Sequence, residues 1–542
     1  MIRADAAQLA GREFDLVVIG GGITGVATAR DAALRGLSVA LVEADDFAAG
    51  TSSKSTKLVH GGLRYLETYQ FRMVAESLRE RERMLRLAPH LTHVRPFLYL
   101  LYRGYPESRF KLNLGLTFYD VASGQWRKRR HRMLSAKQVL AREPHLNPAG
   151  LLGAGQYVDV LTDDARLTID TAKGAAEAGA LLVNHARVTG LVLIDGVARG
   201  VRVTDALSGA DFEILAHQVL NATGPWTERT RELEHGHEAV RLRPTKGVHI
   251  VLRKSDFPMN TAVFLRSPDD NRVVWPIPSL DDSLVYIGTT DTDYTGDPDD
   301  VRPDEADVRY LLNVANQTIP DAHVDASHVV GTWAGLRPLV APAAGTTAGN
   351  TSREHAITLG PSGMLTISGG KLTSSRLMAK QFVDAAEKRL DGTPRRSTAG
   401  STPISGGDAD AIQRVTAAAG AAGVPEQLVA VWIGRYGSNA DRVLANWRQS
   451  KEAAQVIGPR QLTRAEVRYC VAEEMCASLA DLLVRRTSLF FWDELGGTGQ
   501  LDAIADELAA LLGWDAAERQ RQVDQYRELV RQHRPAGMAS AR

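Results

Sequence analysis

Cysteine is nearly absent from this chain of 542 residues, which carries only Cys470 and Cys476. Two thiols cannot build a disulfide framework, and their spacing matches no metal-binding motif, so no metal site is expected. Scarce cysteine favours a reducing compartment. Net charge is also lacking, because Lys and Arg number 64 and Asp and Glu number 64. A globally basic nucleic-acid-binding protein is therefore not indicated, and no nucleic acid is expected as a partner.

Long apolar runs are missing as well. No stretch approaches the roughly 18 apolar residues that a membrane-spanning helix needs, so any contact with a membrane should be peripheral. Residues 1–13 carry charges and no apolar run, so a signal peptide is not expected. We therefore expect a cytoplasmic location. A chain of this length is too long for one compact core and predicts two or three domains.

What the sequence does contain begins with a βαβ pattern. Residues 14–20 read as a buried strand, 23–35 as a helix and 37–43 as a second strand, an order that implies a parallel sheet. Residues 391–408 are rich in Gly, Pro, Ser and Thr and predict a linker, and the chain beyond is helical in character. We therefore predict an α/β part over 1–396, which holds the cofactor and substrate domains discussed below, and a helical domain over 405–542.

The turn after the first strand has the pattern of a dinucleotide site. Gly20, Gly22 and Gly25 form GxGxxG between a strand and a helix, and Glu43 ends the next strand. Gly20 permits the tight turn, Gly22 lets a diphosphate approach the backbone, and Gly25 lets the helix pack closely. The helix N-terminus offers N–H groups to phosphate, and Glu43 can accept hydrogen bonds from a ribose. The pattern alone does not distinguish NAD from FAD.

Two later turns favour FAD. The segment 221–226 follows a strand and resembles a second cofactor-facing turn. The segment 367–371 is a strand-to-helix turn. Flavoproteins often bring such a turn to the flavin ring, where the helix N-terminus stabilises negative charge. A Ser- and Thr-rich loop near residue 53 should also contact the cofactor. The predicted FAD contacts beyond the glycine motif are Ser52, Ser53, Thr56, His60, Gly61, Gly224, Trp226, Gly369, Gly370, Lys371 and Thr373.

Several collinear segments now point to one family. Besides the glycine motif they are 51–67, 162–167, 221–226, 246–250, 288–291, 333–339 and 369–373. Over about residues 14–495 the chain resembles the aerobic, FAD-dependent glycerol-3-phosphate dehydrogenases. The resemblance implies an α/β fold in which a Rossmann-like FAD-binding domain is interwoven with an antiparallel-sheet substrate domain, followed by an all-helical C-terminal domain. It also implies a peripheral enzyme on the inner face of the cell membrane that passes electrons to quinone.

The substrate implied by the resemblance, glycerol 3-phosphate, carries a phosphate dianion, which Arg binds best through paired N–H donors. Arg64, Arg337 and Arg353 are the candidates, with Lys371 near the flavin and Tyr65 as a further substrate contact. For each Arg the alternative is a structural salt bridge.

Oxidation of the secondary alcohol requires loss of a hydride from C2 and of the hydroxyl proton. His249 is the first candidate for the base, because an imidazole near neutral pKa suits proton transfer. Arg337 is expected to orient the alcohol and stabilise alkoxide character, since guanidinium hardly deprotonates. A structural histidine is the alternative for His249, and His60 is a further candidate base.

A basic run over 127–132 follows an apolar and aromatic segment over 110–119. This combination suits anionic lipid, although a solvated basic loop explains it equally well. The helical C-terminal part carries no chemical motif, so docking, homodimer formation and membrane contact are all open for it. The rival functions are a glycerol-3-phosphate oxidase that uses oxygen and makes hydrogen peroxide, an amino-acid oxidase, and a flavin-binding protein without catalysis.

Overall fold

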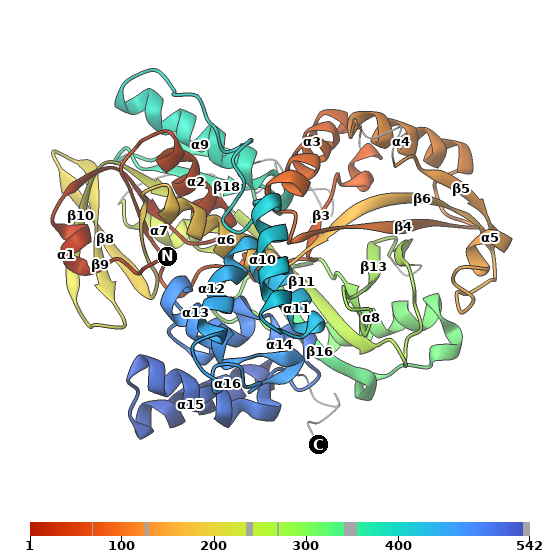
Figure 1. Ribbon diagram of the computed structural model, residues 1–542. Helices are drawn as coiled ribbons and strands as arrows, with labels where there is room; N and C mark the ends of the chain where they lie inside the picture. The colour runs from red at the N-terminus through yellow and green to blue at the C-terminus, as the bar shows by residue number, and fades with distance from the viewer. Residues whose placement is uncertain (68, 125–128, 235–241, 268–269, 341–354, 535–542) are drawn as a thin grey trace.

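The computed structural model describes residues 1–67, 69–124, 129–234, 242–267, 270–340 and 355–534. Two β-sheets lie side by side, and helices cover both, with the last quarter of the chain packed beneath them (Figure 1). No helix within these ranges combines the length and the apolar character needed to cross a bilayer.

The first sheet has a parallel centre, as the βαβ pattern predicted. Strand β1 pairs in parallel with β2 on one side and with β10 on the other. Beyond them, β2 pairs in parallel with β7, and β10 pairs in parallel with β18. Helix α2 (Ile23–Leu34) contacts both α6 (Asp164–Glu177) and α9 (Ser375–Leu390) beside this sheet (Figure 1). Its strands are β1 (Glu13–Ile19), β2 (Val39–Val42), β7 (Leu181–Val183), β8 (Ala186–Ile194), β9 (Val197–Asp205), β10 (Asp211–Asn221), β17 (His355–Leu359) and β18 (Leu365–Gly369).

The second sheet is mainly antiparallel, with β4 and β12 as a parallel pair. Helix α8 (Glu305–Thr318) packs on it, and α3 (Phe71–Leu87) and α4 (Arg109–Ala122) lie along its upper edge in Figure 1. Its strands are β3 (Leu58–Val59), β4 (Thr92–Tyr102), β5 (Arg132–Ser135), β6 (Leu151–Thr162), β11 (Leu242–Arg253), β12 (Ala262–Arg266), β13 (Val273–Pro278), β14 (Leu284–Gly288), β15 (Thr292–Asp293) and β16 (Val329–Val340).

The chain passes repeatedly between the two sheets. It leaves the first sheet after β2, builds β3 to β6 of the second, returns for β7 to β10, leaves again for β11 to β16, and returns for β17 and β18. The predicted interwoven fold is thus confirmed. One expected boundary is displaced: the helix predicted from residue 371 begins at Ser375, because Lys371 is extended and a short turn, η7 (Leu372–Ser374), precedes α9.

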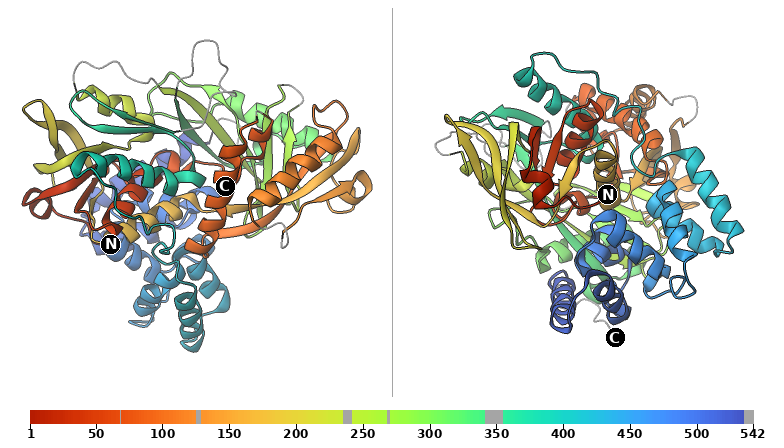
Figure 2. Two further views of the ribbon diagram at one scale, coloured as in Figure 1. Left: turned by 90° about the horizontal axis from the view of Figure 1, so that it is seen from above. Right: turned by 60° about the vertical axis from the view of Figure 1, so that its left-hand side comes forward.

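The C-terminal part is helical, as predicted, and lies below both sheets (Figures 1 and 2). One cluster of buried apolar side chains joins it to the second sheet and contains Trp333 of β16 together with Trp432, Cys470 and Phe491. Its main elements are α10 (Ala409–Ala421), α11 (Glu426–Tyr436), α12 (Ala440–Trp447), α13 (Arg464–Glu474), the π-helical turn η10 (Asp481–Arg486), α14 (Leu489–Trp492), α15 (Leu501–Leu512) and α16 (Ala516–Gln532).

Candidate active site

The glycine motif forms a tight loop between β1 and α2. Gly20 has φ +108°, and a Cβ there would lie 2.7 Å from the Ala222 carbonyl oxygen. A Cβ on Gly25 would collide with the Gly20 carbonyl oxygen, so neither position admits a side chain. Gly22 precedes α2 and supplies no side-chain cap. The backbone N–H groups at the start of α2 fit a bound diphosphate.

Glu43 lies against this loop at the end of β2. Its Oε2 accepts a hydrogen bond from Gly21 N at 2.5 Å, and its Oε1 accepts one from Asp45 N at 2.8 Å. Burial raises the pKa of Glu43 to about 7. Ser52 Oγ accepts a hydrogen bond from Ile23 N at 2.9 Å, so the predicted cofactor loop and the start of α2 do meet.

The distant turn after β18 reaches the same region. Gly369 and Gly370 have φ +80° and +95°. Thr373 Oγ1 accepts a hydrogen bond from His60 N at 3.1 Å and donates one to His60 O at 3.2 Å. Gly61 N donates to the Tyr119 hydroxyl at 2.9 Å. The structure thus brings together the two segments, 60–61 and 369–373, that were predicted to contact FAD.

The third predicted cofactor turn is the short helix η3 (Gly224–Trp226), after β10. A Cβ on Gly50 would lie 2.8 Å from Trp226 Cζ3, so the indole covers the backbone just before the Ser- and Thr-rich loop. Trp226 Nε1 donates to Asp299 Oδ1 at 2.7 Å. Ser53, in that loop, is buried.

A cavity of about 100 Å³ lies between this region and the second sheet. Five of the predicted cofactor or substrate residues line it directly, namely Thr56, His60, Arg64, Tyr65 and, from β16, Arg337. Lys371 adjoins it, with Nζ 3.8 Å from the centre of the Tyr65 ring. Arg353 lies outside the described residues.

Arg337 is held in a fixed orientation. Its Nη1 contacts Asp291 Oδ1 at 3.0 Å, and its Nη2 donates to Thr289 Oγ1 at 2.8 Å and to the Thr290 carbonyl at 3.1 Å. A Cβ on Gly247, in the neighbouring strand β11, would collide with the guanidinium group. The glycine and the three polar partners therefore orient one cation at the cavity wall.

His249, on β11, lies behind that wall. It is not among the described residues that line the cavity, but its Nε2 is 3.0 Å from Thr56 Oγ1, and Thr56 does line it. The ring stacks on Trp333, with centroids 4.7 Å apart, and Phe491 packs edge-on against Trp333. Burial, with a smaller effect of Arg337, holds the pKa of His249 well below 6.5. The imidazole is therefore neutral, the form that a general base must have before it takes up a proton.

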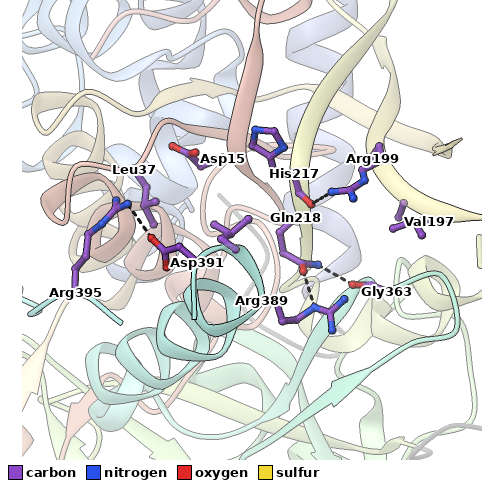
Figure 3. Close-up of a pocket in the computed structure, with 12 residues that line it drawn as sticks. Asp15, Leu37, Val197, Arg199, His217, Gln218, Gly363, Arg389, Asp391 and Arg395 are labelled. Carbon is purple, nitrogen blue, oxygen red and sulfur yellow. Dashed lines mark hydrogen bonds and ion pairs between the residues drawn. The ribbon is translucent and has the colours of Figure 1, made fainter. Parts of the chain in front are cut away.

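A larger cavity of about 430 Å³ lies elsewhere, beside Asp15, His217 and Arg389 (Figure 3). Asp15 is near the start of β1, whereas the glycine loop follows its end. Cofactors of open α/β sheets bind at the carboxyl ends of the strands, so this cavity is not the dinucleotide site.

Comparisons with known proteins agree with this geometry. A family model described as FAD dependent oxidoreductase matches residues 15–376. The chain belongs to this family. A second model, the C-terminal domain of alpha-glycerophosphate oxidase, matches residues 397–519. The predictions of an FAD cofactor and of an oxidoreductase are therefore confirmed.

Two individual relatives indicate a narrower group within this family. The aerobic glycerol-3-phosphate dehydrogenase of Staphylococcus haemolyticus is 39% identical over 524 residues, which cover 94% of this chain and 93% of the relative. The aerobic glycerol-3-phosphate dehydrogenase of Bacillus subtilis is 38% identical over 532 residues, which cover 96% of this chain and 95% of the relative. This FAD-dependent oxidoreductase thus belongs with the aerobic glycerol-3-phosphate dehydrogenases.

Solved structures support the same assignment. The glycerol-3-phosphate dehydrogenase of Bacillus halodurans, solved with FAD, is similar with a TM-score of 0.83 and 32% identity, covering 97% of this chain and 96% of that one. The L-alpha-glycerophosphate oxidase of Mycoplasma pneumoniae, with FAD bound, has a TM-score of 0.55 and 18% identity and covers 72% of this chain and 99% of that one, a likeness of fold alone.

The sequence analysis missed several residues of this oxidoreductase's cavity. Asp291 orients Arg337. It lies in segment 288–291, which contributed to the family resemblance, but no role was predicted for it. Arg272 and Asp159 also line the cavity. Asp159 is buried, paired with Arg81 Nη1 at 2.8 Å and bonded by the Tyr119 hydroxyl. No local pattern marks Arg272 or Asp159, because each reaches the cavity only through the pairing of distant strands.

Proposed function

We propose that this oxidoreductase oxidises sn-glycerol 3-phosphate to dihydroxyacetone phosphate. The observation that carries the proposal is the pair Arg64 and Arg337 on one cavity that also adjoins the 60–61 and 369–373 turns. Two guanidinium groups suit a substrate that is a phosphate dianion at one end and an alcohol at the other. The names of the full-length relatives at 38–39% identity support the same substrate.

The reacting alcohol needs a hydride acceptor and a proton acceptor. When bound, FAD would supply the hydride acceptor for the C2 hydrogen, through the N5 atom of its flavin. Arg64 and Lys371 hold the phosphate, with Arg353 as a further candidate, and Arg337 orients the C2 hydroxyl and stabilises the developing alkoxide. The hydroxyl proton leaves to His249 Nε2, and Thr56 Oγ1 lies on that path because it is 3.0 Å from Nε2 and lines the cavity. His60, on the cavity wall, is the alternative base.

Anaerobic addition of substrate tests this function. We expect glycerol 3-phosphate to bleach the flavin absorbance of the holoenzyme within seconds, whereas glycerol, which lacks the dianion, should leave it oxidised. A glycine or sarcosine control separates the amino-acid oxidase alternative. If FAD-loaded protein stays yellow with glycerol 3-phosphate, the proposed substrate is wrong. Readmitting either oxygen or a soluble quinone then measures the preferred acceptor, for which we propose quinone.

A quinone acceptor requires contact with a membrane, and α4 offers a surface for it. Phe110, Leu114 and Val121 lie on one face of this helix with exposed fractions of 77%, 61% and 60%. Phe71, at the start of α3, packs against Phe118 beside them. Residues 108–132 contain seven Lys or Arg and a single acid, Asp120, which is buried against His131. An exposed apolar stripe with basic flanks matches a surface of anionic lipid.

Vesicle binding tests this surface. The double variant Phe110→Ser, Leu114→Ser should lower co-sedimentation with anionic vesicles about tenfold, since two apolar side chains would no longer enter the headgroup region. The matched control is Leu193→Ser, Leu207→Ser, which removes one exposed leucine from the end of β8 and one from the turn between β9 and β10, and should bind vesicles normally. Equal binding by both double variants would exclude α4 as the docking surface. Flavin reduction by substrate should be unchanged in both.

A further inference from the structure

A buried ion cluster joins the C-terminal helices to the turn that follows β2. The Asp46 carboxylate, fully buried, accepts hydrogen bonds from Arg485 Nε at 2.5 Å, from Arg486 Nη2 at 2.9 Å and from Arg486 Nη1. Asn184 Nδ2 donates to it at 2.9 Å. Both arginines belong to η10, about 440 positions along the chain. The charge of Asp46 is therefore balanced from the C-terminal part of the chain.

The same turn forms one wall of the nucleotide loop. Besides the bond from Gly21 N to Glu43, Ala48 N donates to the Gly21 carbonyl at 3.2 Å. A Cβ on Gly21 would lie 2.8 Å from Phe47 Cδ1. Residues 43–49 thus wrap around Gly21 from both sides, with Asp46 at their centre. A displacement of Asp46 must shift Glu43 and the glycine loop with it.

A metal ion is the competing explanation for this cluster, because Asp46, His185 and Asp481 lie close enough to hold one. Their oxygens are already used, since Arg485 Nη2 contacts Asp481 Oδ1 at 2.5 Å and His185 Nε2 contacts Asp481 Oδ2 at 2.9 Å. Two guanidinium charges at this point also repel a cation. The cluster is therefore a set of ion pairs between two parts of the chain.

We propose that Arg485 and Arg486 are positioning residues for FAD: they hold the 43–49 turn, and through it Glu43 and the glycine loop, in the geometry that binds the adenosine half of the cofactor. This assigns a role to the C-terminal helices, which would support the cofactor site through the 43–49 turn. The inference rests on the assignment of Glu43 to the FAD ribose.

The physical reason is the cost of a buried charge. A carboxylate without partners in a protein interior loses its hydration without compensation, so the turn would move Asp46 toward solvent if the arginines no longer reached it. Lys at position 486 keeps the positive charge but cannot make two parallel bonds to the carboxylate. That substitution should loosen the turn with the least disturbance of the fold.

The test measures FAD binding by apoprotein. Arg486→Lys should raise the dissociation constant for FAD at least tenfold, and the amide of Ala48 should exchange with deuterium faster than in the parent apoprotein. At saturating FAD, the rate of flavin reduction by glycerol 3-phosphate should stay within about twofold, because the substrate cavity lies elsewhere. If Arg486→Lys does not fold, Arg485→Lys, which loses the Nε contact with Asp46, gives the same readouts.

The matched control is Glu474→Gln. It breaks a buried pair between the same two parts of the chain, in which Arg166 Nη1 and Glu474 Oε2 are 2.6 Å apart, but Glu474 has no side-chain contact with residues 43–49 in the described structure. It should lower Tm and leave FAD affinity unchanged. Equal loss of FAD in both variants, or loss in neither, overturns the proposal. If Glu43→Gln binds FAD normally, the ribose assignment has failed and the substrate proposal is untouched.

Discussion

Replacing Arg337 with Lys is expected to slow flavin reduction by glycerol 3-phosphate about a thousandfold while FAD stays bound. The loss has two sources. Lys cannot contact Asp291 and Thr289 at once, so the cation is no longer fixed at the cavity wall. A preoriented donor to a developing oxyanion contributes roughly a hundredfold to a thousandfold in rate. Stopped-flow absorbance of the flavin under anaerobic conditions measures the effect.

The control for this variant is Arg243→Lys. Arg243 lies on β11, the strand paired with that of Arg337, and bonds Asp293 at an exposed position away from the cavity. It should reduce flavin at the parent rate. An Arg337→Lys enzyme that loses less than threefold, with its FAD content intact, would remove Arg337 from the chemistry and leave it as a structural partner of Asp291.

The second large effect is expected at His249. Asparagine keeps a polar group of similar size near Thr56 but cannot take up a proton, so flavin reduction should fall by about two to three orders of magnitude, the usual contribution of a general base. His217→Asn, at an exposed position of β10, is the matched control and should have no effect. If FAD-loaded His249→Asn is reduced at the parent rate, His60 becomes the leading candidate for the base.

The pH dependence sharpens this test. The neutral form of His249 is the active one, and its pKa is held well below 6.5 by burial. Lowering the pH protonates the base only below that depressed pKa, so the parent reduction rate should stay level as the pH falls from 8 to about 6 and should decline only at lower pH. In His249→Asn this acid decline should disappear. A decline centred on 6.5 in the parent would point instead to a solvated histidine.

Much of the fold could be predicted because short-range sequence patterns determine it. The spacing of Gly20, Gly22 and Gly25, a strand before them and Glu43 after the next strand specify a nucleotide loop through sterics that act within about 25 residues. The helical C-terminal part follows in the same way from composition and periodicity. The family resemblance added the interwoven second sheet, which no single pattern predicts.

The cavity was only partly predictable. Arg64 and Arg337 were predicted as phosphate ligands, and both line the same cavity. That His249 lies behind Thr56, and that Asp291 orients Arg337, could not be read from the sequence. Both depend on the register of β11 against β14 and β16, which sets the side chains that face each other across strands.

The sequence by itself determined the class of cofactor, the parallel centre of the first sheet and the identity of the basic residues available to a phosphate, because these depend on backbone sterics and residue chemistry over short spans. The tertiary structure alone decided which cations share a cavity, which face of α4 is exposed, and that Asp46 meets Arg486 from the far end of the chain. Those choices follow from long-range packing, in which burial of a charge is tolerated only where a distant partner arrives to compensate it.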